Sequence, residues 1–185
     1  MTSVSSLRQL TPRRALSMTE ALRLAELQAN RLLEQFAIAD PPTPVSVVSE
    51  LPKVRIEELA KIPVSGSAHW SGQDWIIVVR SDEPLVRKRF SMAHELKHIV
   101  DHPFRDYLYS QPKRTTAGRD RAEVVADHFA ACLLMPKKWI YAAWNEGIRD
   151  VGDLAYFFEV SRVAMERRIR DLGLAPITAP QEVAA

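Results

Sequence analysis

The chain has 185 residues, of which 46% are hydrophobic and 26% charged, and its net charge is +2. This length and composition fit one compact domain with a short appendage, and the small net charge excludes a bulk attraction to nucleic acid or membranes. The single cysteine, Cys132, excludes an intrachain disulfide and is typical of a reducing compartment. Because no apolar run is long enough to span a membrane, we expect a cytoplasmic protein.

The N-terminal segment, residues 1–16, has no acidic side chain, carries three arginines and lacks the apolar core of a secretion signal. We expect a disordered basic tail there. Ser17 and Glu20 have the spacing of a helix capping box and predict the start of a helix. A proline-rich stretch ends this helix, and Pro44 can begin a short second helix that ends near Leu51.

Residues 54–80 change to a strand-like composition. The β-branched run at residues 74–80 predicts a buried strand. Residues 71–73 resemble a hairpin turn that pairs this strand with residues 67–70, so we expect a small antiparallel β-sheet. His69 lies in the hairpin, where an ordinary half-exposed histidine is more frequent than a metal ligand.

The next segment contains the sequence His94-Glu95-x-x-His98. Apolar residues accompany it at helical spacing: Met92, Ala93, Leu96, Ile99 and Val100. Ser91 could cap this helix, and Pro103 would end it. Imidazoles four residues apart lie on one helix face, so they can hold a zinc ion, and the Glu95 carboxylate can then reach a zinc-coordinated water. The alternative is an amphipathic helix with two solvated histidines.

A predicted loop over residues 102–118 follows, and residues 105–121 carry five basic and two acidic side chains. This region could rim a cleft for an acidic partner, although a solvated surface loop is the default interpretation. A long helix is expected over residues 120–135, ended by Pro136, and a further helix follows it. Cys132 on the long helix is expected to be a small buried hydrophobic residue rather than a nucleophile.

Residues 149–174 have the pattern of two short helices joined by a turn, with Ser161 as the cap of the second helix. Residues 175–185 are expected to form a flexible tail. Residues 145–174 carry six acidic and five basic side chains, whereas binding of duplex DNA normally needs a clearly positive face. One cluster of arginines keeps DNA contact open as an alternative function: Arg167, Arg168 and Arg170.

A catalytic zinc ion takes three protein ligands and leaves one position open for water. Glu123 is the candidate third ligand, because its helix follows a loop long enough to fold back over the histidine pair. Asp127 lies one turn further on and could accept a hydrogen bond from a zinc-bound imidazole. Glu123 could instead close a helix capping box with Asp120. Asp101 and His102 are rival ligands, but they lie near the end of the histidine helix, where the geometry is poor.

Three stretches of the chain together resemble the ImmA/IrrE family of zinc metallopeptidases: residues 87–98, 123–136 and 154–174. The resemblance implies an α+β fold, in which a mainly helical, gluzincin-like domain spans residues 17–148. It also implies that the helix-turn-helix-like pair at residues 149–174 packs on that domain.

The resemblance implies that His94, His98 and Glu123 hold zinc and that Glu95 is the general base. Lys97 departs from the family, which usually has glycine there. Family members occur in bacteria and phages and are often paired with a helix-turn-helix repressor that they cleave. We therefore expect a peptidase that acts on such a repressor; a protein that only binds a repressor or operator is the alternative. Three residues are candidates for stabilising the oxyanion: Tyr107, Tyr109 and His128.

Overall fold

The computed structural model describes residues 4–110 and 117–174, apart from the side chains of residues 117–120. The expected tail at residues 175–185 lies outside the described residues. The elements in chain order are α1 (Val4–Arg8), α2 (Met18–Gln35), α3 (Ser46–Ser49), β1 (Val54–Leu59), β2 (Gly66–Trp70), β3 (Trp75–Arg80), α4 (Leu85–Asp101), the 3₁₀ helix η1 (His102–Phe104), α5 (Arg105–Leu108), α6 (Ala117–Leu134), α7 (Lys137–Asn145), α8 (Val151–Phe157) and α9 (Arg162–Asp171).

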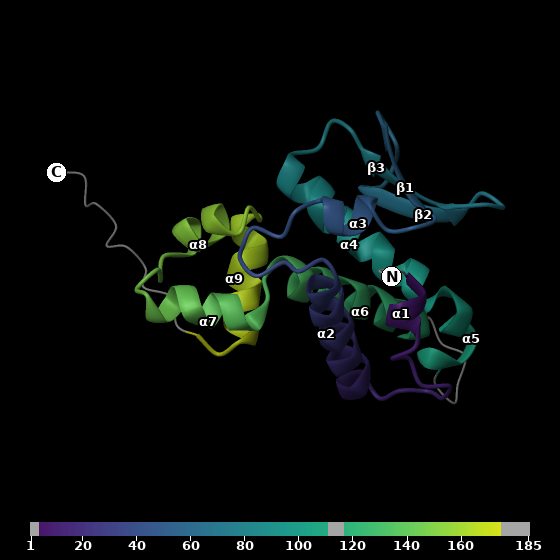
Figure 1. Ribbon diagram of the computed structural model, residues 1–185, viewed down its shortest axis with the longest axis horizontal. Helices are drawn as coiled ribbons and strands as arrows, with labels where there is room; N and C mark the ends of the chain where they lie inside the picture. Colours follow the sequence, from purple (N-terminus) through teal and green to yellow (C-terminus); the bar gives the residue numbers. More distant parts are fainter. Residues whose placement is uncertain (1–3, 111–116, 175–185) are drawn as a thin grey trace.

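Helices make up most of the structure, and a single three-stranded sheet lies against α4 in the described part of the chain (Figure 1). This arrangement confirms the mainly helical α+β fold expected from the sequence. Within the described ranges, no helix combines the length and the apolar character that crossing a membrane requires.

The start of α2 is fixed by the predicted capping box, which is confirmed. The Ser17 hydroxyl accepts a hydrogen bond from the backbone N–H of Glu20 at 3.3 Å, and the Glu20 carboxylate accepts one from the backbone N–H of Ser17 at 2.8 Å. This reciprocal pair satisfies two backbone donors that a helix start otherwise leaves without partners. The apolar face of α2 then packs along α6.

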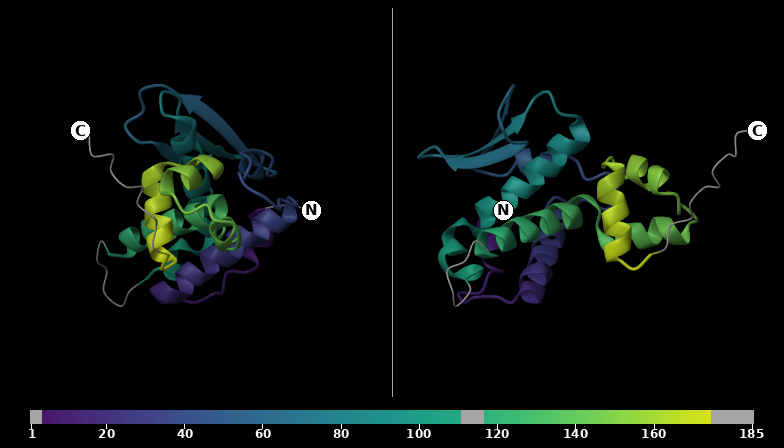
Figure 2. Two further views of the ribbon diagram at one scale, coloured as in Figure 1. Left: turned by 90° about the vertical axis from the view of Figure 1, so that its left-hand side faces the viewer. Right: turned by 180° about the vertical axis from the view of Figure 1, so that it is seen from behind.

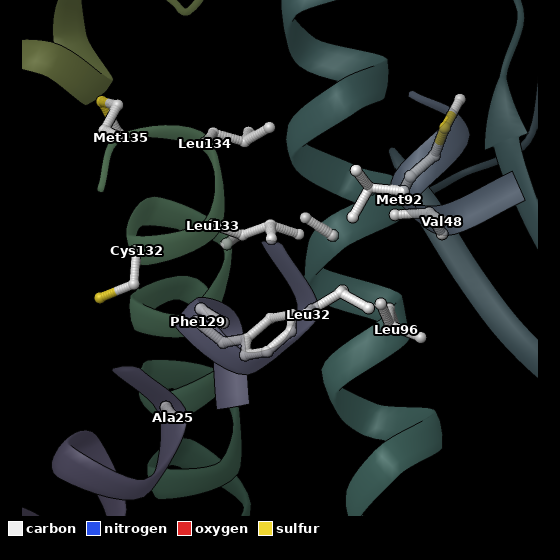
Figure 3. Close-up of a cluster of buried hydrophobic side chains, with 14 of the residues drawn as sticks. Ala25, Leu32, Val48, Met92, Leu96, Phe129, Cys132, Leu133, Leu134 and Met135 are labelled. Carbon is white, nitrogen blue, oxygen red and sulfur yellow. The ribbon is translucent and has the colours of Figure 1, made fainter. Parts of the chain in front are cut away.

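The hydrophobic core lies where α2, α4 and α6 meet (Figure 3). Leu32 of α2, Leu96 of α4 and Phe129 of α6 are fully buried there. Leu133 of α6 and Val48 of α3 extend the core toward the sheet. Because burying one such side chain contributes about 1.5–3 kcal/mol, this junction fixes α4 and α6 relative to each other.

The expected disorder of residues 1–16 is wrong for the described part of that segment. Residues Val4–Arg8 form α1, and Leu7 is fully buried. The Arg8 guanidinium donates hydrogen bonds to the backbone carbonyls of Ile99 at 2.7 Å and Val100 at 3.2 Å. These carbonyls belong to the last turn of α4, where a helix leaves its oxygens without intrahelical partners. Arg8 therefore acts as a cationic cap at the C-terminal end of α4.

The sheet has the strand order β1-β3-β2. Strands β2 and β3 pair antiparallel, as the predicted hairpin requires, but β1 pairs with β3 in parallel. The expectation of a purely antiparallel sheet is therefore wrong, and the sheet is mixed. Strand β3 carries the buried residues Ile77, Val78 and Val79, and α4 packs against it. The more polar strands β1 and β2 form the edges of the sheet.

Helix α4 begins at Leu85, directly after Pro84, and ends at Asp101. The expectation that Ser91 caps this helix is wrong, since Ser91 is buried almost two turns inside it. Pro84 is the N-cap: its φ of −57° matches a helix, its ψ of 149° is extended, and it has no N–H that needs a partner. The predicted end is confirmed, with Pro103 in the 3₁₀ turn that follows.

Helices α7, α8 and α9 gather at one end of the molecule, and α9 lies beside the C-terminal end of α6 (Figures 1 and 2). The predicted cap of α9 is confirmed: the Ser161 hydroxyl accepts a hydrogen bond from the backbone N–H of Ala164 at 3.2 Å. Leu154 and Phe158 are buried between the helices of the pair and their neighbours.

Two buried arginines join this end to the rest of the fold. Arg89 of α4 donates to the backbone carbonyl of Thr43 at 2.6 Å and to that of Glu159 at 2.9 Å. Arg168 of α9 donates from Nε to the carbonyl of Met135 at 3.1 Å. Hydrogen bonds from buried charged groups are directional, so they fix the position of α9 against α6 more tightly than apolar contact alone.

Candidate metal centre

The paired histidines of α4 point at one spot, as helix geometry predicts. The Nε2 atoms of His94 and His98 lie 3.1 Å apart, and their rings meet edge to face. His94 is partly buried and His98 somewhat more open to solvent. Two imidazole nitrogens that point at one spot from this separation could supply two of the four ligands of a tetrahedral metal site.

Glu123 approaches the same spot from α6. Its Oε2 atom lies 3.1 Å from Nε2 of His94, and its Oε1 atom lies 3.4 Å from Nε2 of His98. Because α6 begins at Ala117, Glu123 sits within the helix, and the alternative of a capping box that starts at Asp120 is wrong. The Glu123 side chain is 55% exposed, so the cluster opens to solvent.

The donor set fits a zinc ion in chemistry and spacing. Candidate ligand atoms of His94, His98 and Glu123 all lie within 4.8 Å of one another, so the cluster could hold a metal ion. Zinc ligands sit about 2.0–2.1 Å from the ion, which places neighbouring ligand atoms of a tetrahedral site roughly 3.3 Å apart. The Nε2 atoms of His94 and His98 are 3.1 Å apart, and each lies 3.1–3.4 Å from one of the two Glu123 oxygens, which is close to that value.

Asp127 supports the cluster from behind. Its Oδ1 atom lies 2.9 Å from Nδ1 of His94, on the opposite side of the ring from the cluster. We assign the ring proton to Nδ1, which donates to the carboxylate and leaves the Nε2 lone pair free for a metal. This hydrogen bond holds the pKa of the Asp127 carboxyl below its usual value.

Glu95 lies next to the cluster and against the sheet. A Cβ atom added to Gly66 at the start of β2 would lie 3.2 Å from Cβ of Ser91, 3.3 Å from Cγ of Glu95 and 3.4 Å from its Oε1. The strand therefore approaches the Glu95 side chain closely only because residue 66 is glycine. The sequence reasoning missed this contact, although a glycine within a strand is a signal of close backbone approach.

The charges of the cluster shift one another's pKa values. Burial lowers the pKa of His94, but the hydrogen bond with Asp127 and the nearby carboxylates outweigh it and raise the pKa above its usual value. Burial, reinforced by His94, lowers the pKa of His98 and favours the neutral ring that binds metals. Burial also raises the pKa of Glu95, and the neighbouring Glu123 adds to this effect.

The rival ligands lie away from the cluster. Asp101 is buried and accepts hydrogen bonds from Nζ of Lys97 at 2.5 Å and from the hydroxyl of Tyr109. His102 packs edge to face against Trp75, with ring centroids 4.8 Å apart. The unusual Lys97 is 1% exposed, so it forms a buried ion pair that sequence spacing alone did not reveal.

The three candidates for stabilising the oxyanion contact other side chains. Tyr109 is engaged by Asp101, and the ring of Tyr107 meets that of Phe104. Nε2 of His128 lies 3.4 Å from Sγ of Cys132, a contact that the sequence reasoning missed. Burial raises the pKa of Cys132 to about 11, so its thiol stays protonated and the expectation of a buried, unreactive cysteine is supported. His69 is exposed on β2, in the predicted hairpin.

Comparison with known proteins places the chain in a family. The model of the IrrE N-terminal-like domain, a peptidase family designated M78, matches residues 52–170. The chain belongs to this family. The ImmA/IrrE resemblance noted in the sequence is thereby confirmed, and the matched range contains the strands, both halves of the metal cluster and most of α9.

Among solved structures, a Mycobacterium tuberculosis transcriptional regulator is similar, with a TM-score of 0.67 at 13% sequence identity. The similarity covers 98% of this chain and 54% of the regulator, so the chain spans about half the length of that protein. At this identity the likeness is one of fold. A search of curated proteins found no significant match.

Proposed function

We propose that this protein is a cytoplasmic zinc-dependent endopeptidase that cleaves a partner protein, a helix-turn-helix transcriptional repressor. The observation that carries the proposal is the approach of two imidazole nitrogens and one carboxylate to within 4.8 Å, with Glu95 directly beside them. Membership of a peptidase family supports a protein substrate. The choice of a repressor rests on the ImmA/IrrE resemblance.

His94, His98 and Glu123 would hold the zinc ion. When bound, zinc polarises the scissile carbonyl and lowers the pKa of the attacking water. The Glu95 carboxylate accepts the proton of that water and then donates it to the leaving amine. Asp127 keeps the His94 ring in the tautomer that turns Nε2 toward the cluster.

DNA contact receives little support from the arginines that first suggested it. Arg168 is 3% exposed and donates to the Met135 carbonyl, so its charge is not presented to a duplex. Arg167 lies with Nη1 3.8 Å from a carboxylate oxygen of Asp127, beside the metal cluster. Arg167 and Arg170 remain exposed, but two arginines among the six acidic side chains of residues 145–174 give little affinity for phosphates.

The decisive experiment compares the metal content and cleavage activity of purified variants. The wild type should contain stoichiometric zinc and should cleave the repressor encoded beside its gene. Glu95→Gln should keep the zinc and lose at least a hundredfold in cleavage rate, because it removes the proton acceptor without removing a ligand. His98→Ala and Glu123→Ala should each lose zinc, measured by elemental analysis.

Glu146→Gln is the matched control, because Glu146 is an exposed glutamate at the end of α7. It should retain both zinc and activity. Cleavage by Glu95→Gln at the wild-type rate would refute the mechanism, and full zinc content in Glu123→Ala would refute the ligand assignment. Retention of an uncut repressor by the zinc-loaded wild type would show holding rather than cutting.

A further inference from the structure

A groove of about 630 Å³ lies between α4, α6 and α9, beside the cluster of His94, His98 and Glu123. Asp127 lines the groove and bonds to Nδ1 of His94, so the groove adjoins the proposed catalytic site on the side of Asp127. Side chains of α2, α4, α6 and α9 form its walls. Pockets that bind ligands have volumes of about 300–1,000 Å³, so this groove has room for several residues of a peptide.

Part of the groove wall is apolar and partly open to solvent. Val86 and Phe90 contribute from α4, Val124 from α6 and Val163 from α9. Val124 is 39% exposed and Val163 is 74% exposed. Apolar side chains that remain accessible along one groove mark a surface that a partner covers.

Three arginines border the same groove. The side chains of Arg87 and Arg167 are more than half exposed, and Arg168 lies deeper. Nη2 of Arg168 is buried and has no hydrogen-bond partner among the described residues. The nearby Cys132 is a protonated thiol, which is a weak acceptor. The accessible guanidinium groups are those of Arg87 and Arg167, and they favour a ligand that brings a carboxylate.

The charge balance of the groove points the same way. Its lining includes the carboxylates of Asp127 and Asp171 against the three arginines, which leaves one positive charge in excess. Asp127 is already engaged by His94, and its distance of 3.8 Å from Arg167 exceeds that of a hydrogen bond. Burial lowers the pKa of His128, the remaining titratable group of the lining, and keeps that ring neutral.

We propose that this groove binds the substrate polypeptide on one side of the scissile bond and selects an apolar residue with an acidic residue within two positions of it. The apolar side chain packs on the valine-rich wall, and the carboxylate pairs with Arg167 at the mouth. Alternate side chains of an extended peptide point the same way about 7 Å apart, so both can enter one groove. This inference rests on the proposed peptidase function and names the class of its substrate.

The first test is the selection of peptides from a random 12-residue display library on zinc-loaded Glu95→Gln protein, which binds without cutting. Peptides with Asp or Glu within two positions of Leu, Ile, Val or Phe should be enriched. Adding Arg167→Glu should reverse the charge preference toward Lys and Arg. Arg170→Glu is the matched control on the same helix and outside the groove lining, and it should leave the selection unchanged.

The second test uses two peptides with the expected pattern that differ in one residue. One contains Leu-x-Glu and the other Leu-x-Lys. The Glu95→Gln protein should bind the first roughly tenfold more tightly, and Arg167→Glu should invert that ratio, because charge-assisted pairs are the stronger hydrogen bonds. Val163→Ser, at an exposed wall position, should weaken both peptides without changing the ratio. This variant keeps the test informative if Arg167→Glu does not fold.

The outcomes separate this inference from the proposed function. Absence of enriched peptides, or enrichment without an acidic preference, overturns the inference. An acidic preference that Arg167→Glu leaves unchanged overturns it as well. If the expected peptides bind but the wild type cuts none of them, the groove assignment stands and the proposed catalysis falls. If the wild type cuts peptides irrespective of charge, catalysis stands and the groove assignment falls.

Discussion

Helices α4 and α6 both contribute to the candidate metal centre, but different forces hold them in place. Helix α4 carries three buried charged residues, Arg89, Lys97 and Asp101, each with partners inside the protein. Helix α6 faces α2 and α4 with apolar residues such as Phe129 and Leu133. Both helices share the apolar core, and α4 adds directional polar contacts to it.

The difference has a physical consequence for the site. A buried charge tolerates only partners of the right kind at the right distance, because its removal from water must be offset by specific hydrogen bonds. An apolar side chain accepts any neighbour of suitable volume. Helix α4, which supplies both histidines and Glu95, therefore has more specific partners than α6, which supplies Glu123.

Replacing Lys97 by Met should have the largest effect on this comparison. The substitution leaves the Asp101 carboxylate buried, with the Tyr109 hydroxyl as its hydrogen-bond partner among the described residues. Breaking a buried ion pair from one side costs about 3–5 kcal/mol, so urea denaturation should show a loss of that size in the free energy of unfolding. The double variant Lys97→Met/Asp101→Asn removes both charges and should recover much of the loss.

The double variant also provides the control. If the losses of the two single substitutions simply add in the double variant, the pair does not act as a unit, and the contrast between α4 and α6 is weakened. Nearly wild-type stability of Lys97→Met would have the same meaning.

A smaller loss is expected for Phe129→Leu on α6. Phe129 is fully buried against α2 and α4, and leucine keeps its apolar character while giving up part of its volume. Replacing a buried Phe by Ala costs about 3–5 kcal/mol, and leucine restores part of that volume, so the loss measured by urea denaturation should stay below about 3 kcal/mol. A loss above about 3 kcal/mol would show that α6 is packed as rigidly as α4.

The smallest effect on stability is expected for Gly66→Ala, where β2 approaches Glu95. The added methyl would sit 3.3 Å from Cγ of Glu95, so the side chain or the strand must move by a few tenths of an ångström. The free energy of unfolding should change by less than about 1 kcal/mol. The proposed proton acceptor is displaced, however, so kcat/KM for peptide cleavage should fall roughly tenfold.

Ser67→Ala, at the exposed neighbouring position of β2, is the matched control and should leave kcat/KM unchanged. Zinc content should stay stoichiometric in both variants, because neither residue is a candidate ligand. Unchanged kcat/KM in Gly66→Ala would mean that the close approach of β2 has no bearing on the position of Glu95.

Local features were predictable where a short stretch of sequence determines its own geometry. The capping residues Ser17 and Ser161 mark helix starts because their hydroxyls accept bonds from backbone groups three residues away. The start of α4 was mispredicted because Ser91 resembled a cap, whereas Pro84 defines that end. The mixed sheet could not be predicted from the hairpin alone. Strand β1 pairs with the edge of β3 that the hairpin leaves open, and its direction depends on the path of the chain between them.

The sequence by itself determined that two imidazoles four residues apart share a helix face, since the pitch of an α-helix fixes that relation whatever surrounds it. Only the tertiary structure decided that Glu123 meets them, that Lys97 is buried with Asp101, and that a groove with two exposed arginines lies between α4, α6 and α9. These relations join residues on different helices or depend on what covers a helix face. They follow from the packing of the whole chain, because no local backbone preference brings distant segments together.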